Sequence, residues 1–254
     1  MKVTPKKALG QHFLHNEEIA FNIVNSLQSN NKNILEIGPG MGVLTKYLLQ
    51  KENINFSVVE IDNESVIYLQ KHYPQLQNHI YATDFLQMDL GKIYTTPLSI
   101  IGNFPYNIST QILFKIYENK NLVTEVVGMF QKEVAERVAA QPGKKMYGIL
   151  SVLLQAFYDI EYLFTVDENQ FTPPPKVQSG VIRLQLNPEK RLCCDENIFK
   201  NVVKTAFNQR RKTLRNSLKT FQFQENYLQN KIFTLRPEQL SVAQFEEICL
   251  HLIP

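Results

Sequence analysis

The chain has 254 residues, of which 44% are hydrophobic and 20% are charged, and its formal net charge is +3. This composition is typical of a folded protein with one large core and a smaller appendage, and it excludes a chain dominated by disorder. The basic start lacks the apolar core of a secretory leader, and no stretch reaches the roughly 18 apolar residues of a membrane span. We therefore expect a cytoplasmic protein without membrane contact.

Residues 33–103 alternate short apolar runs with helix-like stretches. Strands are predicted over 33–38, 55–62, 79–84 and 98–103. The intervening stretches 41–52 and 63–73 carry apolar residues at helical spacing. Strands separated by helices predict an α/β fold with a doubly wound parallel sheet.

The later part of the chain changes character near residue 187. A strand and a helix are predicted over 125–140, a buried helix over 147–159 and a late strand over 177–186. After Asn187 and Pro188 only helical segments are expected. We therefore predict a sheet domain over 1–187 and a small all-helical domain over 188–254.

A glycine-rich turn follows the first predicted strand, with Gly38, Gly40 and Gly42 after the acidic Glu36. Glycines there allow a tight turn and the close approach of a ligand at the carboxyl end of the sheet. A dinucleotide site would place its third glycine where this chain has Val43. The pattern therefore favours S-adenosylmethionine over a nicotinamide dinucleotide.

Two acidic residues end the next two strands. Glu60 can accept hydrogen bonds from ribose hydroxyls, and Asp84 can accept one from the exocyclic amine of the cofactor's adenine. Each acid alone could equally be a solvated strand end or a helix cap. Their recurrence on successive strand ends favours a nucleoside site.

The fourth strand ends in the sequence GNFPYN at 102–107, a poor continuation for a buried strand. Pro105 fixes its own φ and restricts Phe104 to extended conformations, so the turn is stiff. Asn103 therefore presents a polar amide at the same edge as the acids.

With these residues the chain resembles the ribosomal RNA adenine dimethylase family, and most closely its bacterial small-subunit branch. The resemblance covers nearly the whole length, through KALGQHFL at 7–14, EIGPGMGVLT at 36–45, VVEID at 58–62, TDFL at 83–86, GNFPYNIST at 102–110, QKEVAERV at 131–138, FTPPPKVQSGVIRL at 171–184 and AFNQRRKTLRNSL at 206–218.

The resemblance implies a Rossmann-like class I methyltransferase domain followed by a helical domain. It implies transfer of methyl groups from S-adenosylmethionine to N6 of two adjacent adenosines in a hairpin loop near the 3′ end of small-subunit (16S) rRNA. The implied cofactor contacts are His12, Leu14, Gly38, Gly40, Glu60, Asp84 and Asn103. Many relatives have asparagine at the position of His12, which leaves a backbone contact intact but puts a side-chain contact in question.

The chemistry expected of this site centres on Asn103. Its amide oxygen, with the Phe104 or Pro105 carbonyl, can accept the two hydrogens of the target amine and aim its lone pair at the methyl group. Tyr106 is predicted to stack on the flipped-out base, with Phe171 as a second face. The alternative for Phe171 is a core aromatic beside a rigid loop.

The positive charge is concentrated between Asn197 and Gln224, a stretch that has no acidic residue. A single helix is predicted to present one basic stripe to RNA phosphates. The residues assigned to RNA binding are Lys204, Arg210, Arg211, Lys212, Arg215 and Lys219. A merely solvated basic face is the alternative.

Three other functions have weaker support in the sequence. A large-subunit rRNA adenine methyltransferase would not be expected to carry AFNQRRKTLRNSL, and a DNA adenine methyltransferase would need a separate sequence-reading domain. A non-catalytic assembly factor is disfavoured by the intact site. The histidines and cysteines show no metal-ligand spacing, so we expect no metal, and a monomer that acts on small-subunit rRNA within an immature subunit.

Overall fold

The computed structural model describes residues 3–253, which form two compact units. The first unit takes in the described residues up to Ala135 together with Ile160–Leu186, and the second takes in Glu136–Asp159 together with the described residues from Asn187 onward. The predicted cut near residue 187 coincides with the start of the later segment of the second unit. The segment Glu136–Asp159, expected in the sheet domain, instead belongs to the helical unit because its helix α7 (Ile149–Gln155) packs on α8 (Glu196–Asn208) and α10 (Val242–Leu250).

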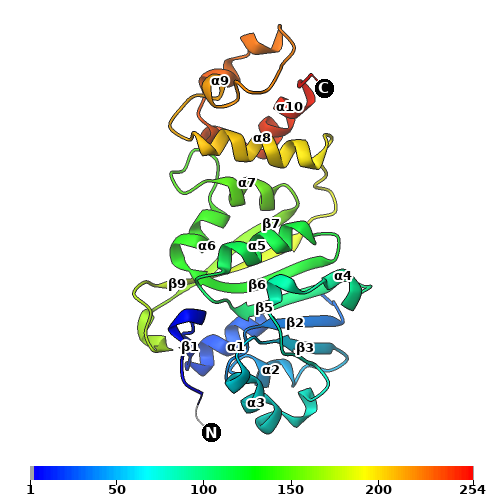
Figure 1. Cartoon of the computed structure of the whole chain (residues 1–254), viewed down its shortest axis with the longest axis vertical. Helices are drawn as coiled ribbons and strands as arrows, with labels where there is room; N and C mark the ends of the chain where they lie inside the picture. Colours follow the sequence, from blue (N-terminus) through cyan, green and yellow to red (C-terminus); the bar gives the residue numbers. More distant parts are fainter. Residues whose placement is uncertain (1–2, 254) are drawn as a thin grey trace. The chain divides into compact units, whose positions relative to one another are not determined.

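A seven-stranded sheet organises the fold, in the order β4-β3-β2-β5-β6-β9-β7 (Figure 1). Strands β2 to β6 run parallel to one another, and β9 is antiparallel to β6. The bounds are β2 Asn33–Ile37, β3 Asn55–Val59, β4 Ile80–Tyr81, β5 Leu98–Asn103, β6 Val123–Gln131, β7 Tyr158–Val166 and β9 Ser179–Leu186. The predicted α/β fold is therefore confirmed, with a sheet that is parallel over β2 to β6 and mixed as a whole.

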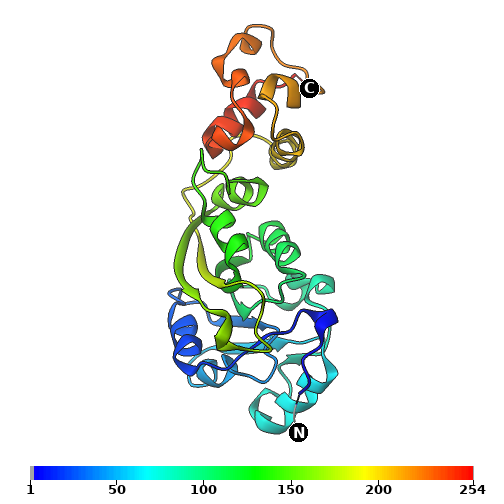
Figure 2. The ribbon, with the colours of Figure 1, turned by 90° about the vertical axis from the view of Figure 1, so that its left-hand side faces the viewer.

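Both faces of the central strands are buried, as expected for strands joined by crossover helices. All five residues of β2 are buried, and Ile34 packs in one apolar cluster with residues of α1 (Glu17–Asn25), α2 (Thr45–Leu48) and α3 (Asn63–His72). The buried side chains of α5 (Ser109–Glu118) are not part of that cluster. Figure 2 shows α1 and α5 on opposite sides of the sheet.

Several elements differ from the predictions. Helix α2 and strand β4 are shorter than expected, and α7 ends at Gln155, before the edge strand β7, which was not predicted. A two-stranded ribbon was also missed: β1 (Phe13–Leu14) pairs antiparallel with β8 (Phe171–Thr172). This ribbon pairs Phe13 with Thr172 and Leu14 with Phe171, and local sequence patterns carry no information about pairing between segments so far apart.

The second unit is helical from Asn187 onward, apart from an isolated bridge between Phe223 and Leu252. Its longer helices α8 and α10 bury Phe199 and Phe245, and the short α9 (Leu214–Ser217) buries Leu214. The other α-helices of the described residues are α4 Leu90–Ile93 and α6 Lys132–Ala139. Among the described residues, no helix is both long and apolar enough to cross a membrane.

Candidate active site

The glycine-rich turn after β2 has the geometry that only glycine tolerates well. Gly38, Gly40 and Gly42 all have positive φ angles, of 65°, 56° and 82°. A Cβ on Gly40 would also lie 2.8 Å from the Phe13 ring. The turn thus packs closely against the N-terminal segment, and Gly38 and Gly40 line a cavity.

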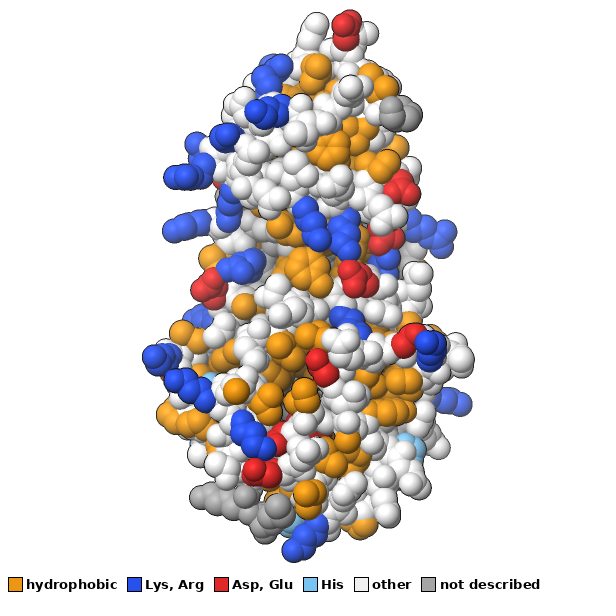
Figure 3. Space-filling model, viewed as in Figure 1, with side chains coloured by type: hydrophobic (Ala, Val, Ile, Leu, Met, Phe, Trp, Pro, Cys, Tyr) orange, Lys and Arg blue, Asp and Glu red, His pale blue; other side chains and the backbone are white. Residues whose placement is uncertain are grey.

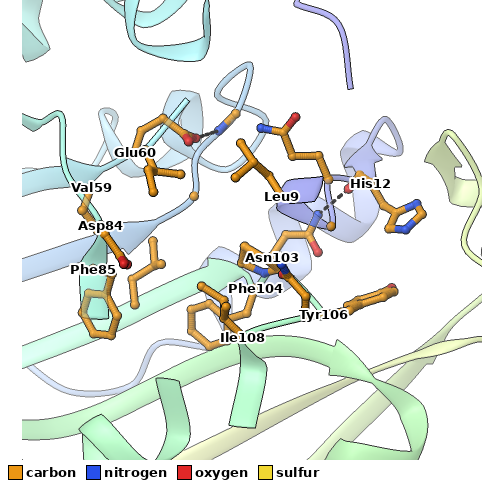
Figure 4. Close-up of a pocket in the computed structure, with 18 of the residues that line it drawn as sticks. Leu9, His12, Val59, Glu60, Asp84, Phe85, Asn103, Phe104, Tyr106 and Ile108 are labelled. Carbon is orange, nitrogen blue, oxygen red and sulfur yellow. Dashed lines mark hydrogen bonds between the residues drawn. The ribbon is translucent and has the colours of Figure 1, made fainter. Parts of the chain in front are cut away.

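That cavity lies at the carboxyl ends of β2, β3 and β5 and is roofed by residues Leu9 to Phe13. It brings together eight of the predicted site residues, His12, Gly38, Gly40, Glu60, Asp84, Asn103, Pro105 and Tyr106. Figure 4 shows the labelled side chains of this set around one hollow. The cavity therefore gathers most of the predicted cofactor-binding and catalytic residues, although the role of each residue stays a prediction.

Glu60 directly follows β3 and is a buried carboxylate with only 5% of its surface exposed. Its two oxygens accept hydrogen bonds from the backbone amides of Gly40 (3.1 Å) and Asp62 (2.9 Å). Burial raises the pKa of Glu60, and these amides oppose the rise. The carboxylate is therefore fixed between the glycine turn and the start of α3.

Asp84 caps the short 3₁₀ turn Phe85–Gln87 by accepting a hydrogen bond from the Leu86 amide (2.9 Å). Lys115, on α5, supports the same loop by donating to the carbonyls of Leu86 (2.9 Å) and Met88. Burial lowers the pKa of Lys115, while the Asp84 carboxylate favours its charged form. No sequence pattern marks Lys115, because its partners are main-chain carbonyls.

The amide of Asn103 is held in one orientation. Its Nδ2 donates to the backbone carbonyl of His12 (2.8 Å), drawn as a dashed line in Figure 4. In that view Asn103 lies between Glu60 and Asp84 on one side and the His12 and Tyr106 rings on the other. The hydrogen bond fixes which atom of the amide is the donor, and so leaves Oδ1 as the acceptor.

Tyr106 and His12 form the other end of the site. Their rings stack with centroids 5.3 Å apart, and His12 Nδ1 donates to the carbonyl of Pro173 (2.7 Å). The Tyr106 hydroxyl is hydrogen-bonded to Ser179. Burial raises the pKa of Tyr106, so the phenol stays protonated.

Two predicted site residues lie elsewhere. Leu14 and Phe171, which face each other across the β1–β8 ribbon, are 4% and 2% exposed and pack in the apolar cluster under the sheet. Neither lines the cavity. The structure thus corrects the prediction that Phe171 stacks on the base: its ring is a core aromatic. It gives no support for a side-chain contact of Leu14 with a cofactor.

The N-terminal segment is fastened over the cavity by contacts that the sequence did not predict. Lys6 forms an ion pair with Asp62, which also accepts from Gln11 Nε2 (3.3 Å), and Asn107 Nδ2 donates to the carbonyl of Ala8 (3.2 Å). Although burial would raise it, these partners hold the pKa of Asp62 below its usual value. An ion pair and hydrogen bonds therefore connect the N-terminal segment to the loops that follow β3 and β5.

A further acid lies beneath the glycine turn. Glu36, in β2, is 1% exposed and accepts a hydrogen bond from the Thr45 hydroxyl (2.6 Å). Burial raises the pKa of Glu36 to about 8, against the effect of that hydrogen bond. The residue is therefore largely protonated at neutral pH.

The basic residues of the second unit do not form the predicted continuous stripe. Helix α8 ends at Asn208, and a turn separates it from α9 because the chain folds back there to bury Leu214. Arg210 donates to the carbonyl of Lys145 and faces Glu238, and Arg215 donates to the carbonyl of Leu228 (2.7 Å). These two arginines therefore have partners within their own unit.

The other predicted RNA-binding residues, Lys204, Arg211, Lys212 and Lys219, are exposed. Figure 3 shows lysine and arginine side chains gathered over α9 and the end of α8. Among the described residues, no group of three or more histidine, cysteine, aspartate or glutamate side chains could hold a metal ion.

Comparison with known proteins gives consistent results. A model of the family described as "Ribosomal RNA adenine dimethylase" matches residues 3–251. "Ribosomal RNA small subunit methyltransferase A" of Cytophaga hutchinsonii is 57% identical over 249 residues, covering 97% of this chain and 96% of the relative. The protein of the same description from Parabacteroides distasonis is 55% identical, covering 98% and 94%.

Two solved structures share the fold. A dimethyladenosine transferase from Plasmodium falciparum superposes with a TM-score of 0.77 at 24% identity, covering 94% of this chain and 96% of that one. The 23S rRNA methyltransferase ErmE superposes with a TM-score of 0.72 at 22% identity, covering 94% and 100%. At these identities the likeness shows the Rossmann-like methyltransferase fold.

Proposed function

The chain belongs to the ribosomal RNA adenine dimethylase family, and we propose that it transfers methyl groups from S-adenosylmethionine to N6 of two adjacent adenosines in the 3′-terminal hairpin loop of small-subunit rRNA. The observation that carries this proposal is the fixed amide of Asn103, between the two acidic strand ends and the paired rings of His12 and Tyr106.

The cavity fits S-adenosylmethionine by the chemistry of its lining. The Gly38 and Gly40 backbone lets a ligand approach without a Cβ in the way, Glu60 would hold the ribose hydroxyls, and Asp84 would accept from the adenine amine. When bound, S-adenosylmethionine supplies a methyl group made electrophilic by its sulfonium. The chain's own residues then have to orient the nucleophile.

The N6 amine of adenine is a poor nucleophile because its lone pair is delocalised into the ring. Asn103 Oδ1 would accept one amine hydrogen, and a backbone carbonyl of the rigid turn would accept the other. The Pro105 carbonyl already accepts from the Ile108 amide (3.3 Å), so the Phe104 carbonyl is the better second acceptor. With both hydrogens held, the lone pair points at the methyl carbon, and the geometry provides the main rate enhancement. The proton leaves to water after methyl transfer.

The RNA is proposed to contact the exposed cations of the second unit, chiefly Arg211, Lys212 and Lys219. Arg210 and Arg215 would instead shape the loop through their bonds to main-chain carbonyls. We further propose that the protein acts as a monomer in the cytoplasm on an immature small subunit. Label from S-adenosylmethionine should then appear on immature subunits and not on naked rRNA, and the reverse result would refute this choice of substrate.

The test of the chemistry is Asn103→Ala, with Asn107→Ala as its control. Both changes remove an amide that tethers the N-terminal segment through a main-chain carbonyl, but only Asn103 is placed to hold the amine. Asn103→Ala should bind S-adenosylmethionine nearly normally and lose methyl transfer by a factor on the order of 10³. Asn107→Ala should keep most of its turnover. An Asn103→Ala protein with substantial turnover would sink the proposed mechanism.

A further inference from the structure

We propose that Ser179 is a positioning residue for methyl transfer, acting through Tyr106: its hydroxyl fixes the tyrosine ring for stacking on the target base, while His12 closes the ring face that the base does not use. This inference rests on the proposed function, because it takes Tyr106 as the residue that receives the base.

Ser179 is a rigid anchor. It is fully buried, it opens β9, and it is paired with Gln131 of β6. The residue before it is fixed twice to Lys132, whose backbone amide donates to the Gln178 carbonyl and whose Nζ donates to Gln178 Oε1, both at 2.9 Å. The Ser179 hydroxyl therefore has little freedom to follow a moving partner.

Tyr106, in contrast, has a ring that needs such an anchor. It follows Pro105 in a turn at the cavity, its side chain is only partly buried, and its hydroxyl is hydrogen-bonded to Ser179, 73 residues along the chain. The backbone of the turn is fixed separately, because the Ser109 hydroxyl donates to the Tyr106 carbonyl (3.1 Å). The Ser179 bond thus acts on the ring direction, which a stacking residue must hold.

His12 determines which face of Tyr106 is available. The two rings, 5.3 Å apart and inclined by 29°, are already in stacking contact and leave no room for a third ring between them. The His12 ring is itself held by its bond to the Pro173 carbonyl. A base that stacks on Tyr106 therefore has to use the opposite face.

The chain offers a matched control for the loss of a buried serine–tyrosine hydrogen bond. Ser57, in β3, makes the same kind of bond with the Tyr94 hydroxyl; both residues are buried and neither lines the cavity. Ser57→Ala therefore reports what such a loss does to the fold alone.

The experiment measures kcat, the dissociation constant for S-adenosylmethionine, and the fluorescence of a hairpin RNA with 2-aminopurine at the target position. Ser179→Ala and Tyr106→Phe delete the same hydrogen bond from its two ends. Each should lower kcat about three- to tenfold and weaken the stacking signal, with cofactor affinity unchanged. The double variant should be no worse than either single one, and Ser57→Ala should keep the wild-type kcat.

Three results would overturn the inference: a wild-type kcat in Ser179→Ala, effects of the two single changes that multiply, or an equal loss in Ser57→Ala. Should Ser179→Ala not fold, a wild-type kcat in Tyr106→Phe alone refutes it. Failure of the proposed function is distinct, since the wild-type protein would then not methylate adenosine N6 at all.

Discussion

The buried acid beneath the glycine turn makes the stability of the protein depend on pH in a defined direction. Glu36 has an ordinary pKa of 4.5 when exposed and one of about 8 in the fold. A carboxyl group whose pKa is raised by folding binds its proton more tightly in the folded state. Its contribution to stability is therefore complete below pH 4.5 and is lost as the pH rises to about 8.

Replacing this residue by glutamine removes the titration and little else. The amide of Glu36→Gln can still accept the hydrogen bond from the Thr45 hydroxyl. One proton separates the folded and unfolded states across the window, so the free energy of unfolding of the wild type should fall relative to the variant by about 1.4 kcal/mol per pH unit. Across the whole window the difference reaches about 5 kcal/mol.

The assay is denaturant unfolding of both proteins between pH 5 and 8.5, without S-adenosylmethionine. Glu17→Gln serves as a control whose effect should not change with pH in this range. The hydrogen bond from the Lys46 ammonium lowers the pKa of Glu17 below its ordinary 4.5, so the small advantage of the wild type is complete above pH 4.5 and is lost only at lower pH. A difference between wild type and Glu36→Gln that stays constant from pH 5 to 8 would refute the reasoning.

Two further predictions concern the binding of S-adenosylmethionine and the binding of RNA. Lys115→Met keeps the apolar stem but removes both hydrogen bonds to the loop after Asp84; calorimetry should show S-adenosylmethionine binding weakened severalfold, and an unchanged affinity would contradict the supporting role. Arg211→Ala combined with Lys212→Ala should weaken RNA binding and reduce its salt dependence by about one to two ions, whereas Lys71→Ala, an exposed change on α3, should leave both unchanged.

The parts of the site that the sequence predicted are those determined by local chemistry. The positive φ angles at positions 38 and 40 favour glycine, so the turn can be predicted from the glycines in the sequence. Glu60, Asp84 and Asn103 each follow an apolar run, and parallel strands bring their carboxyl ends to one edge. The apolar runs, and the glycines and polar residues that follow them, were therefore enough to predict the side of the cavity formed by the strand ends.

The parts that were missed depend on contacts between distant segments. The N-terminal segment over the cavity is held by the ion pair between Lys6 and Asp62 and by the hydrogen bond from Asn103 to the His12 carbonyl. No periodicity in the sequence indicates such pairs. The predicted basic stripe was wrong for a related reason. Helical spacing continued past Asn208, but the burial of Leu214 required the chain to turn, and tertiary packing overrode the local pattern.

Position 12 shows how the main chain can carry a role that the side chain does not. The family resemblance left open whether histidine there could do what asparagine does in relatives. The atom that orients Asn103 is the backbone carbonyl of residue 12, which every amino acid supplies. The side chain of residue 12 is therefore not needed to orient Asn103. In this chain it stacks on Tyr106 and donates a hydrogen bond to the Pro173 carbonyl. The departure at position 12 thus changes the surroundings of the stacking ring and leaves the amide that holds the amine as it was.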